Sequence, residues 1–315
     1  MLTSSKPLKA AATVVALGAA VWVLIRTARP NWEAVLAAAR TLRWGWVAAA
    51  SLVWLGSFVF LVRLWAASLR WWGQRLGALA GLRMFVRSNL ARYIPGAVWQ
   101  FAGLAVLAAE AGISPAAVTG AVLLQQLVLL ATGIVLSIAL APPLLASAGV
   151  TLPPWALLAT ALTGLVLLLG LFRRLAPFVS RRMSLALPNP PWPSFARYVA
   201  GCAAGWAGYG LAFWLLSRAL LGEAAPELMV AAPAFIASYV AGIIAVFAPG
   251  GIVVREAALV ATLAGHVGAD RAFLLAVAAR LWAISLEILS VVTVLALPGP
   301  AAPADDQGLR STNTN

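Results

Sequence analysis

The chain has 315 residues, of which 63% are hydrophobic and 10% are charged, and its formal net charge at pH 7 is +13. A water-soluble fold of this size cannot cover so much apolar surface with so few polar side chains, so the composition excludes one. The arginines lie at the ends of apolar segments and not in a long basic region, which argues against nucleic-acid binding. The sequence therefore predicts an all-α, polytopic integral membrane protein.

About six apolar stretches are long enough to cross a hydrocarbon core about 30 Å thick as full transmembrane helices. In chain order they are residues 9–25, 46–66, 116–140, 155–172, 198–220 and 272–297. We expect a single transmembrane domain over residues 1–300 and a short disordered C-terminal tail over residues 301–315.

Two further apolar regions differ from these spans because a Pro-Gly pair interrupts each one. Residues 82–111 contain Pro95-Gly96, and residues 228–265 contain Pro249-Gly250-Gly251. Broken backbone inside a membrane is tolerated only where it is buried in protein or lines a polar cavity. We therefore expect two re-entrant hairpins whose breaks mark a substrate pathway.

The charges of the loops predict how the protein is oriented. Residues 67–88 carry four arginines and no acid, and residues 173–197 carry five arginines and no acid. Loops rich in arginine remain in the cytoplasm, so we expect these two on the cytoplasmic side. Residues 141–154 are uncharged and residues 221–227 carry two acids, so we expect both of these loops outside. This pattern predicts a multi-pass protein of the cell membrane, plasma or inner, with both termini in the cytoplasm. The side from which the second hairpin enters stays open.

The two breaks belong to segments that match each other. Residues 93–98 and 247–252 align at an offset of 154 residues, and each is followed by a short apolar segment, a turn and a full span. We interpret these as repeat units near residues 82–140 and 228–297 that enter from opposite faces, an inverted repeat of the kind that many transporters use. Coincidence is the alternative, because the chain has 26 glycines and 19 prolines.

Ionisable residues gather near the breaks, where an unpaired charge costs several kcal/mol. Arg255 and Glu256 follow the second break by one helical turn, and Arg280 and Glu287 share one face of the last span. Structural ion pairs, or a snorkelling Arg92, are the competing interpretations. The candidate substrate-binding and pathway residues are Arg92, Tyr93, Pro95, Gly96, Trp99, Gln100, Gln125, Gln126, Pro249, Gly250, Gly251, Arg255, Glu256, Arg280 and Glu287.

Signals for catalysis are weak. Cys202 and His266 are the only cysteine and histidine, so they cannot form a zinc site, and no nucleophile elbow or Walker loop occurs. We expect no enzymatic activity, no catalytic residues, no metal and no cofactor. An intramembrane enzyme that uses Glu256 or Glu287 as a base is the alternative.

The segments Arg92-Tyr93-Ile94-Pro95-Gly96-Ala97-Val98-Trp99 and Ala248-Pro249-Gly250-Gly251-Ile252-Val253-Val254-Arg255-Glu256 carry a resemblance. With Arg63 and Arg280, they make the chain similar to the lysylphosphatidylglycerol synthase transmembrane, or flippase-like, family over nearly its whole length. The resemblance implies a lipid-translocating membrane domain, here without the soluble aminoacyl-transferase domain of the synthases. Val253 replaces a usual glycine and Gln125-Gln126 a common Glu-Arg pair, so we expect a less charged pathway.

The leading hypothesis is a lipid transporter, or flippase, that moves a phospholipid or related polar-headed lipid between leaflets. Arg92, Arg255 and Arg280 would contact an anionic or zwitterionic headgroup, and Glu256 and Glu287 would hold those arginines or respond to protons. The alternative is a non-transporting scaffold that presents a lipid to a separate glycosyl- or aminoacyl-transferase. Expected partners are membrane lipids, with a lipid-modifying enzyme or a second copy of the chain as further options.

Overall fold

The computed structural model describes residues 40–89, 99–140, 191–245 and 253–296, together with Gly251 and short stretches elsewhere. Within this described part every regular element is a helix and no strand occurs, which confirms the predicted all-α fold. The elements are α3 (Trp44–Ser68), η2 (Leu69–Trp72), α4 (Ala78–Asn89), α5 (Trp99–Glu110), α6 (Pro115–Ala139), α9 (Trp192–Leu221), η4 (Gly222–Ala224), α10 (Leu228–Ile244), α11 (Val254–Val267) and α12 (Ala269–Ala296).

Four described segments are long and apolar enough to cross a membrane. They are Trp44–Trp72, Pro115–Ala139, Trp192–Ala224 and Ala269–Ala296. Each coincides with one of the spans predicted from the sequence. The predicted span 9–25 lies outside the described residues except for Gly18. The predicted span 155–172 is described in part, and its helical residues include a short apolar helix at Trp155–Gly164.

The two interrupted regions each contain a pair of short helices. α4 and α5 have 12 residues each, α10 has 17 and α11 has 14. At 1.5 Å per residue these helices are about 18 to 26 Å long, which is less than the thickness of a hydrocarbon core. α4 packs on α5, and α10 packs on α11, as expected for hairpins. The predicted Pro95-Gly96 and Pro249-Gly250 breaks themselves lie outside the described residues.

The described chain repeats one order of elements. A long helix, a 3-10 turn, two short helices and another long helix form the series α3 to α6, and the same series returns from α9 to α12. Glycines with positive φ occupy equivalent turns, since Gly112 (φ 68°) precedes α6 and Gly268 (φ 86°) precedes α12. The helix after the break begins at Trp99 in one half and at Val254 in the other, 155 residues later.

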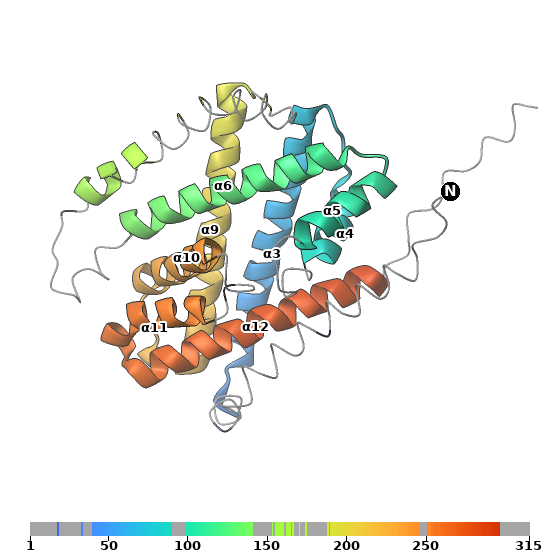
Figure 1. Ribbon diagram of the computed structural model, residues 1–315. Helices are drawn as coiled ribbons and strands as arrows, with labels where there is room; N and C mark the ends of the chain where they lie inside the picture. The colour runs from blue at the N-terminus through green and yellow to red at the C-terminus, as the bar shows by residue number, and fades with distance from the viewer. Residues whose placement is uncertain are drawn as a thin grey trace, which may run out of the picture.

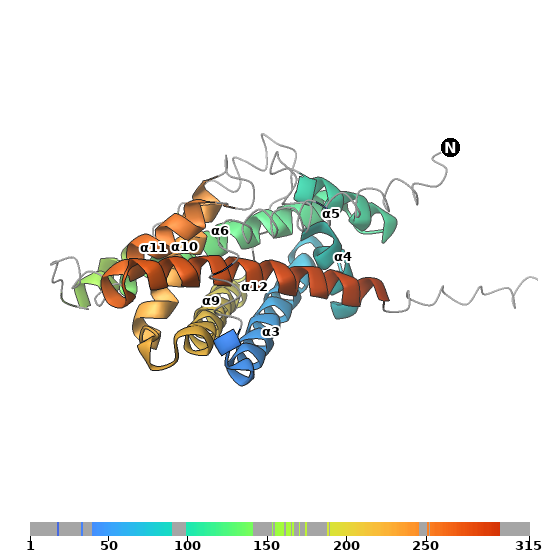
Figure 2. The ribbon, with the colours of Figure 1, turned by 90° about the horizontal axis from the view of Figure 1, so that it is seen from below.

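The two halves run in opposite directions. Figures 1 and 2 show α3 antiparallel to α9, and α6 antiparallel to α12. The contacts between the halves correspond as well. The last long helix of each half packs on the first short helix of the other half, so α6 contacts α10 and α12 contacts α4. α3 packs on α9 more extensively than any other pair of helices. This arrangement is an inverted repeat, with each hairpin supported by a long helix of the opposite half.

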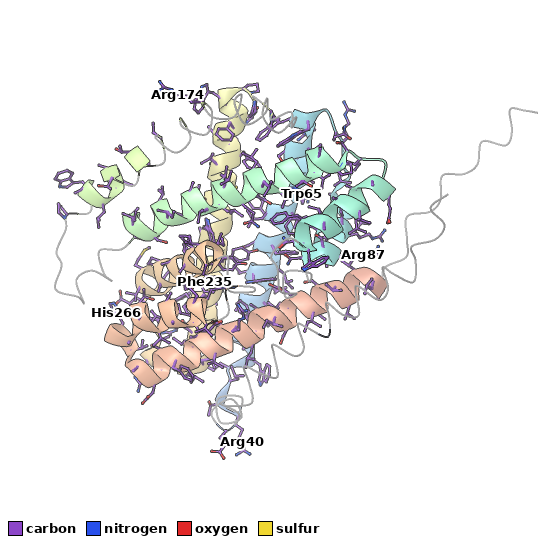
Figure 3. All side chains as sticks on the ribbon, viewed as in Figure 1. Arg40, Trp65, Arg87, Arg174, Phe235 and His266 are labelled. Carbon is purple, nitrogen blue, oxygen red and sulfur yellow. The ribbon has the colours of Figure 1, made fainter. Side chains whose placement is uncertain are left out.

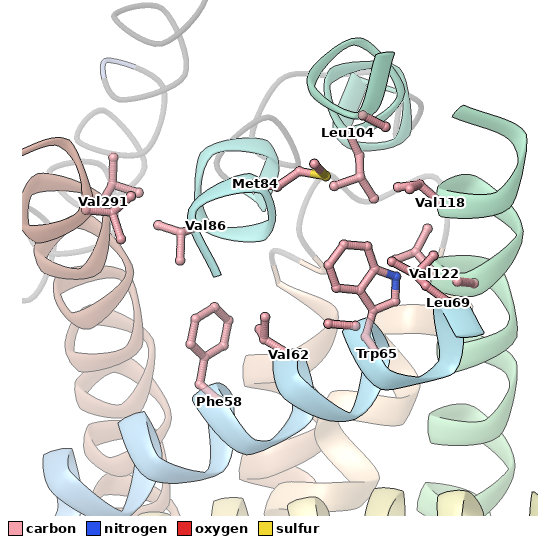
Figure 4. Close-up of a cluster of buried hydrophobic side chains, with 14 of the residues drawn as sticks. Phe58, Val62, Trp65, Leu69, Met84, Val86, Leu104, Val118, Val122 and Val291 are labelled. Atoms are coloured by element: carbon pink, nitrogen blue, oxygen red, sulfur yellow. The ribbon is translucent and has the colours of Figure 1, made fainter. Parts of the chain in front are cut away.

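A cluster of buried apolar side chains holds the first half together. Trp65 of α3 is fully buried and points toward Met84, Leu104 and Val122 from the next three helices (Figure 4). Because lipid tails are as apolar as these side chains, close van der Waals packing stabilises this contact more than exclusion from water does.

Small residues allow the helices of the second half to approach closely. A Cβ atom added to Gly210 of α9 would lie 2.7 Å from Cβ and 3.1 Å from Cα of Ala232 in α10. Backbone cannot yield as a flexible side chain can, so Gly210 sets the distance between these helices.

We expect Gly210→Ala to lower the free energy of unfolding by about 1 to 3 kcal/mol, because overpacking forces α9 and α10 apart. Gly56→Ala is the matched control, since a Cβ there meets nothing within 4 Å. Thermal unfolding of both variants in detergent measures the difference. Equal melting temperatures would contradict the packing argument.

Candidate functional site

A cavity of about 340 Å³ lies where the two halves meet. Its lining comes from both halves of the molecule, with Trp54 of α3, Tyr239 of α10 and Glu287 of α12 among the lining residues. The volume falls within the range of ligand pockets, about 300 to 1,000 Å³. Both pairs of short helices therefore contribute to the wall of one cavity.

Arg255 is the cation of the described lining, and its position follows from the start of α11. The guanidinium carbon lies 3.8 Å from the centroid of the Tyr239 ring and 6.0 Å from that of Phe235. A cation over an aromatic face is attracted by the ring quadrupole, most strongly where water is excluded. The aromatic rings of α10 thus hold the charge of Arg255 at the cavity wall.

Two glycines make room for the stem of Arg255. A Cβ atom at Gly251 would lie 2.9 Å from Cα of Gly242 and 3.0 Å from Cδ of Arg255. A Cβ at Gly242 would collide with Cγ and Cδ of Arg255. Gly251 also has φ 67°, a conformation that glycine adopts at little cost. The glycines at the second break therefore serve to seat this arginine.

Val253 stands at the N-cap of α11 with φ 71°, which is the left-handed region that β-branched residues avoid. A glycine would adopt this conformation at little cost. The valine side chain forms no capping hydrogen bond, so the first-turn amides of α11 have no side-chain acceptor from their N-cap.

Glu256 faces away from Arg255, although the two are neighbours in the chain. Its Oε1 lies 3.6 Å from Nε of Arg280, which is 5% exposed. Its Oε2 is buried and accepts no hydrogen bond within the described part of the structure. Glu256 and Arg280 therefore form an ion pair that joins α11 to α12, and neither appears in the cavity lining.

The structure separates the predicted pathway residues into three groups. Those that line the cavity are Gln100, Gln125, Gln126, Gly251, Arg255 and Glu287. Trp99 is 51% exposed and is absent from the lining, as are Glu256 and Arg280. Those that lie outside the described residues are Arg92, Tyr93, Pro95, Gly96, Pro249 and Gly250.

Aromatic rings form much of the cavity wall, and the sequence did not point to them. Trp54 lies 5.7 Å from Tyr209 between ring centroids, Tyr209 stacks on Tyr239 at 6.5 Å, and Trp206 meets Tyr239 at 5.4 Å. The indole N–H of Trp206 donates to the carbonyl oxygen of Leu129 at 2.9 Å and fixes that ring. The sequence does not show whether an aromatic side chain within an apolar span faces a cavity or the lipid.

Side-chain amides provide most of the polar lining. Gln125 donates through Nε2 to the carbonyl oxygen of Leu61 at 2.8 Å, and this bond anchors α6 to α3. Asn89, Gln100 and Gln126 also line the cavity, and within the described chain their amides make no hydrogen bond. The sequence pointed to the glutamines but not to Asn89, which ends α4 just before the first break.

A double-mutant cycle tests the buried ion pair. We expect Glu256→Gln and Arg280→Met to couple by about 1 to 3 kcal/mol in unfolding free energy, because each single change removes an opposite charge from a buried or partly buried partner. Arg218 and Glu223 are the control, since Glu223 is 83% exposed despite its 2.7 Å contact. Their coupling should stay below about 1 kcal/mol. Additive effects at Glu256 and Arg280 would show that the pair contributes nothing.

The sequence profile of a family described as the lysylphosphatidylglycerol synthase TM region matches residues 10–291. The matched segment includes both short-helix pairs and every described residue that lines the cavity. None of the curated proteins matches the chain. The chain therefore belongs to the lysylphosphatidylglycerol synthase transmembrane-region family, a family of lipid-related membrane domains.

Proposed function

We propose that the protein carries a polar-headed lipid, a phospholipid or a related lipid, between the two leaflets of the membrane. The observation that carries this proposal is the cavity between the inverted halves, which is lined by Arg255 and Glu287. Charged side chains inside an apolar protein are costly, and on a cavity wall they suit a polar guest. The lipid-related family of the chain supports the same interpretation.

The dimensions and chemistry of the cavity suit a headgroup and not a whole lipid. About 340 Å³ accommodates a polar head, while the acyl chains would stay in the surrounding bilayer. Arg255 would bind the phosphate, because its planar fork of N–H donors matches phosphate oxygens. The N-terminal amides of α11 would add favourable partial charge beside it.

The inverted repeat supplies a way to open the cavity to each side in turn. Two short-helix pairs of opposite direction flank it, and each rests on a long helix of the other half. Rocking one half against the other would expose the same site to either leaflet. The step makes and breaks no covalent bond, so we propose a transporter without enzymatic activity, driven by gradients or by the lipid distribution.

The positions of the arginines support the proposed orientation in the cell membrane. The end of α3 and the beginning of α9 lie at one end of the molecule, where Figure 3 also labels Arg174. Arg40 lies at the opposite end. Since Arg70 and Arg75 follow the end of α3 and Arg197 lies near the beginning of α9, that end would face the cytoplasm.

Transport by proteoliposomes tests the proposal. We expect purified protein to move fluorescent phospholipids between leaflets, as measured by the fraction protected from a membrane-impermeant quencher. Arg255→Ala should slow this movement at least tenfold, since the phosphate loses its cationic partner, and Arg255→Lys should restore part of it. Arg218→Ala is the matched control, because Arg218 contacts Trp46 and Glu223 and does not line the cavity.

Other outcomes would contradict this proposal in distinct ways. Binding of lipid without movement, across a broad panel of lipids, would favour a scaffold that presents lipid to a separate transferase. A change in the mass of the lipid after incubation would favour an intramembrane enzyme. Equal transport by wild type and Arg255→Ala would remove Arg255 from the pathway.

A further inference from the structure

We infer that the headgroup taken into the cavity is a hydroxyl-rich ring joined to a phosphate, such as an inositol or sugar phosphate. This inference rests on the proposed function and specifies the substrate class. Three features of the lining carry it, namely amides without partners, aromatic faces and the position of the single described cation.

The amides of Asn89, Gln100 and Gln126 come from α4, α5 and α6 and meet at one cavity. Each carboxamide offers two N–H donors and an oxygen acceptor with two lone pairs. Asn89 is only 6% exposed, and the described chain provides none of these three amides with a hydrogen bond. The guest that satisfies them best must both donate and accept hydrogen bonds.

Headgroups differ in this respect. A hydroxyl donates and accepts, so a polyol ring can bond to several carboxamides at once. A quaternary ammonium does neither, and a lysyl ammonium only donates. Leaving the amides unpaired after water is displaced would weaken binding of those two heads.

Aromatic rings of the cavity wall suit the flat sides of such a ring. Trp54 and Tyr209 line the cavity with their ring centroids 5.7 Å apart, whereas the Tyr239 ring is already covered by Arg255. The negative face of an aromatic ring attracts polarised C–H bonds, which a sugar or inositol presents on both of its sides. A ring stacked there keeps its hydroxyls at its edge, where carboxamides can reach them.

A cationic head is the main competitor, because aromatic faces also attract cations and Glu287 lines the same cavity. Arg255, however, already covers the Tyr239 ring at 3.8 Å. A second cation at that face would be repelled by the guanidinium, whereas a phosphate would be attracted. Glu287 can accept hydrogen bonds from hydroxyls as readily as from an ammonium.

Equilibrium binding of short-chain lipids to the purified protein in detergent tests the inference directly. The probes are dioctanoyl phosphatidylinositol, phosphatidylcholine, lysylphosphatidylglycerol and galactosyl diacylglycerol, compared by isothermal titration calorimetry. We expect phosphatidylinositol to bind at least tenfold more tightly than the choline and lysyl lipids. The galactosyl lipid, which has the ring without phosphate, should be intermediate in wild type and insensitive to Arg255→Ala.

Variants of the amides separate recognition from folding. Gln126→Leu and Asn89→Leu should each weaken phosphatidylinositol binding about tenfold and leave phosphatidylcholine binding unchanged. Gln74→Leu is the control, because Gln74 lies outside the cavity lining. Equal or tighter binding of the choline or lysyl lipid would overturn the inference, and so would equal losses for every lipid in the amide variants.

The same lipids in proteoliposomes distinguish this inference from the proposed transport. Tight binding of phosphatidylinositol without movement would support the headgroup assignment and overturn transport. Movement of phosphatidylcholine alone would support transport and overturn the headgroup assignment. The absence of both binding and movement for all four lipids would overturn both.

Discussion

Backbone polar groups must be paired when they lie in hydrocarbon, and this constraint shapes the whole molecule. A helix that stops partway through the bilayer exposes unpaired N–H and C=O groups at its end, so it needs protein around it. Here each pair of short helices packs on a long helix of the opposite half: α10 packs on α6, and α4 packs on α12. Residues of both pairs of short helices line the cavity between the two halves.

The same constraint explains why neighbouring charges have different tasks. Arg255 and Glu256 are adjacent, so they point about 100° apart around α11. Arg255 reaches the cavity over Tyr239, with its stem against Gly242 and Gly251. Glu256 points to α12, where Arg280 balances its charge. Arg255 therefore faces the cavity, and Glu256 joins two helices.

Hydropathy and backbone chemistry predicted much of this fold, because spans and Pro-Gly breaks are local properties of the chain. Arg255, which the sequence places one turn after the second break, lines the cavity, and its role in a pathway stays a prediction. The sequence predicts that Glu256 and Glu287 hold the arginines but does not assign a glutamate to each one, and packing brings Glu256 to 3.6 Å from Arg280. The aromatic wall was missed because Trp54 and Tyr209 read alike whether they face lipid or a cavity. Rotation of a span about its axis is set by its neighbours.

The two halves share a fold but divide the chemistry of the cavity unequally. The charged lining residues of the described chain, Arg255 and Glu287, come from the second half, whereas the unpaired amides of Asn89, Gln100 and Gln126 come from the first. Symmetry of the backbone therefore does not extend to recognition. If the halves rock against each other as proposed, opening at one side separates a phosphate from its cation, and opening at the other frees the ring from its amides. A headgroup that needs both sets of contacts would be held only while the cavity is closed. Binding of such a substrate would therefore be coupled to the rocking of the two halves.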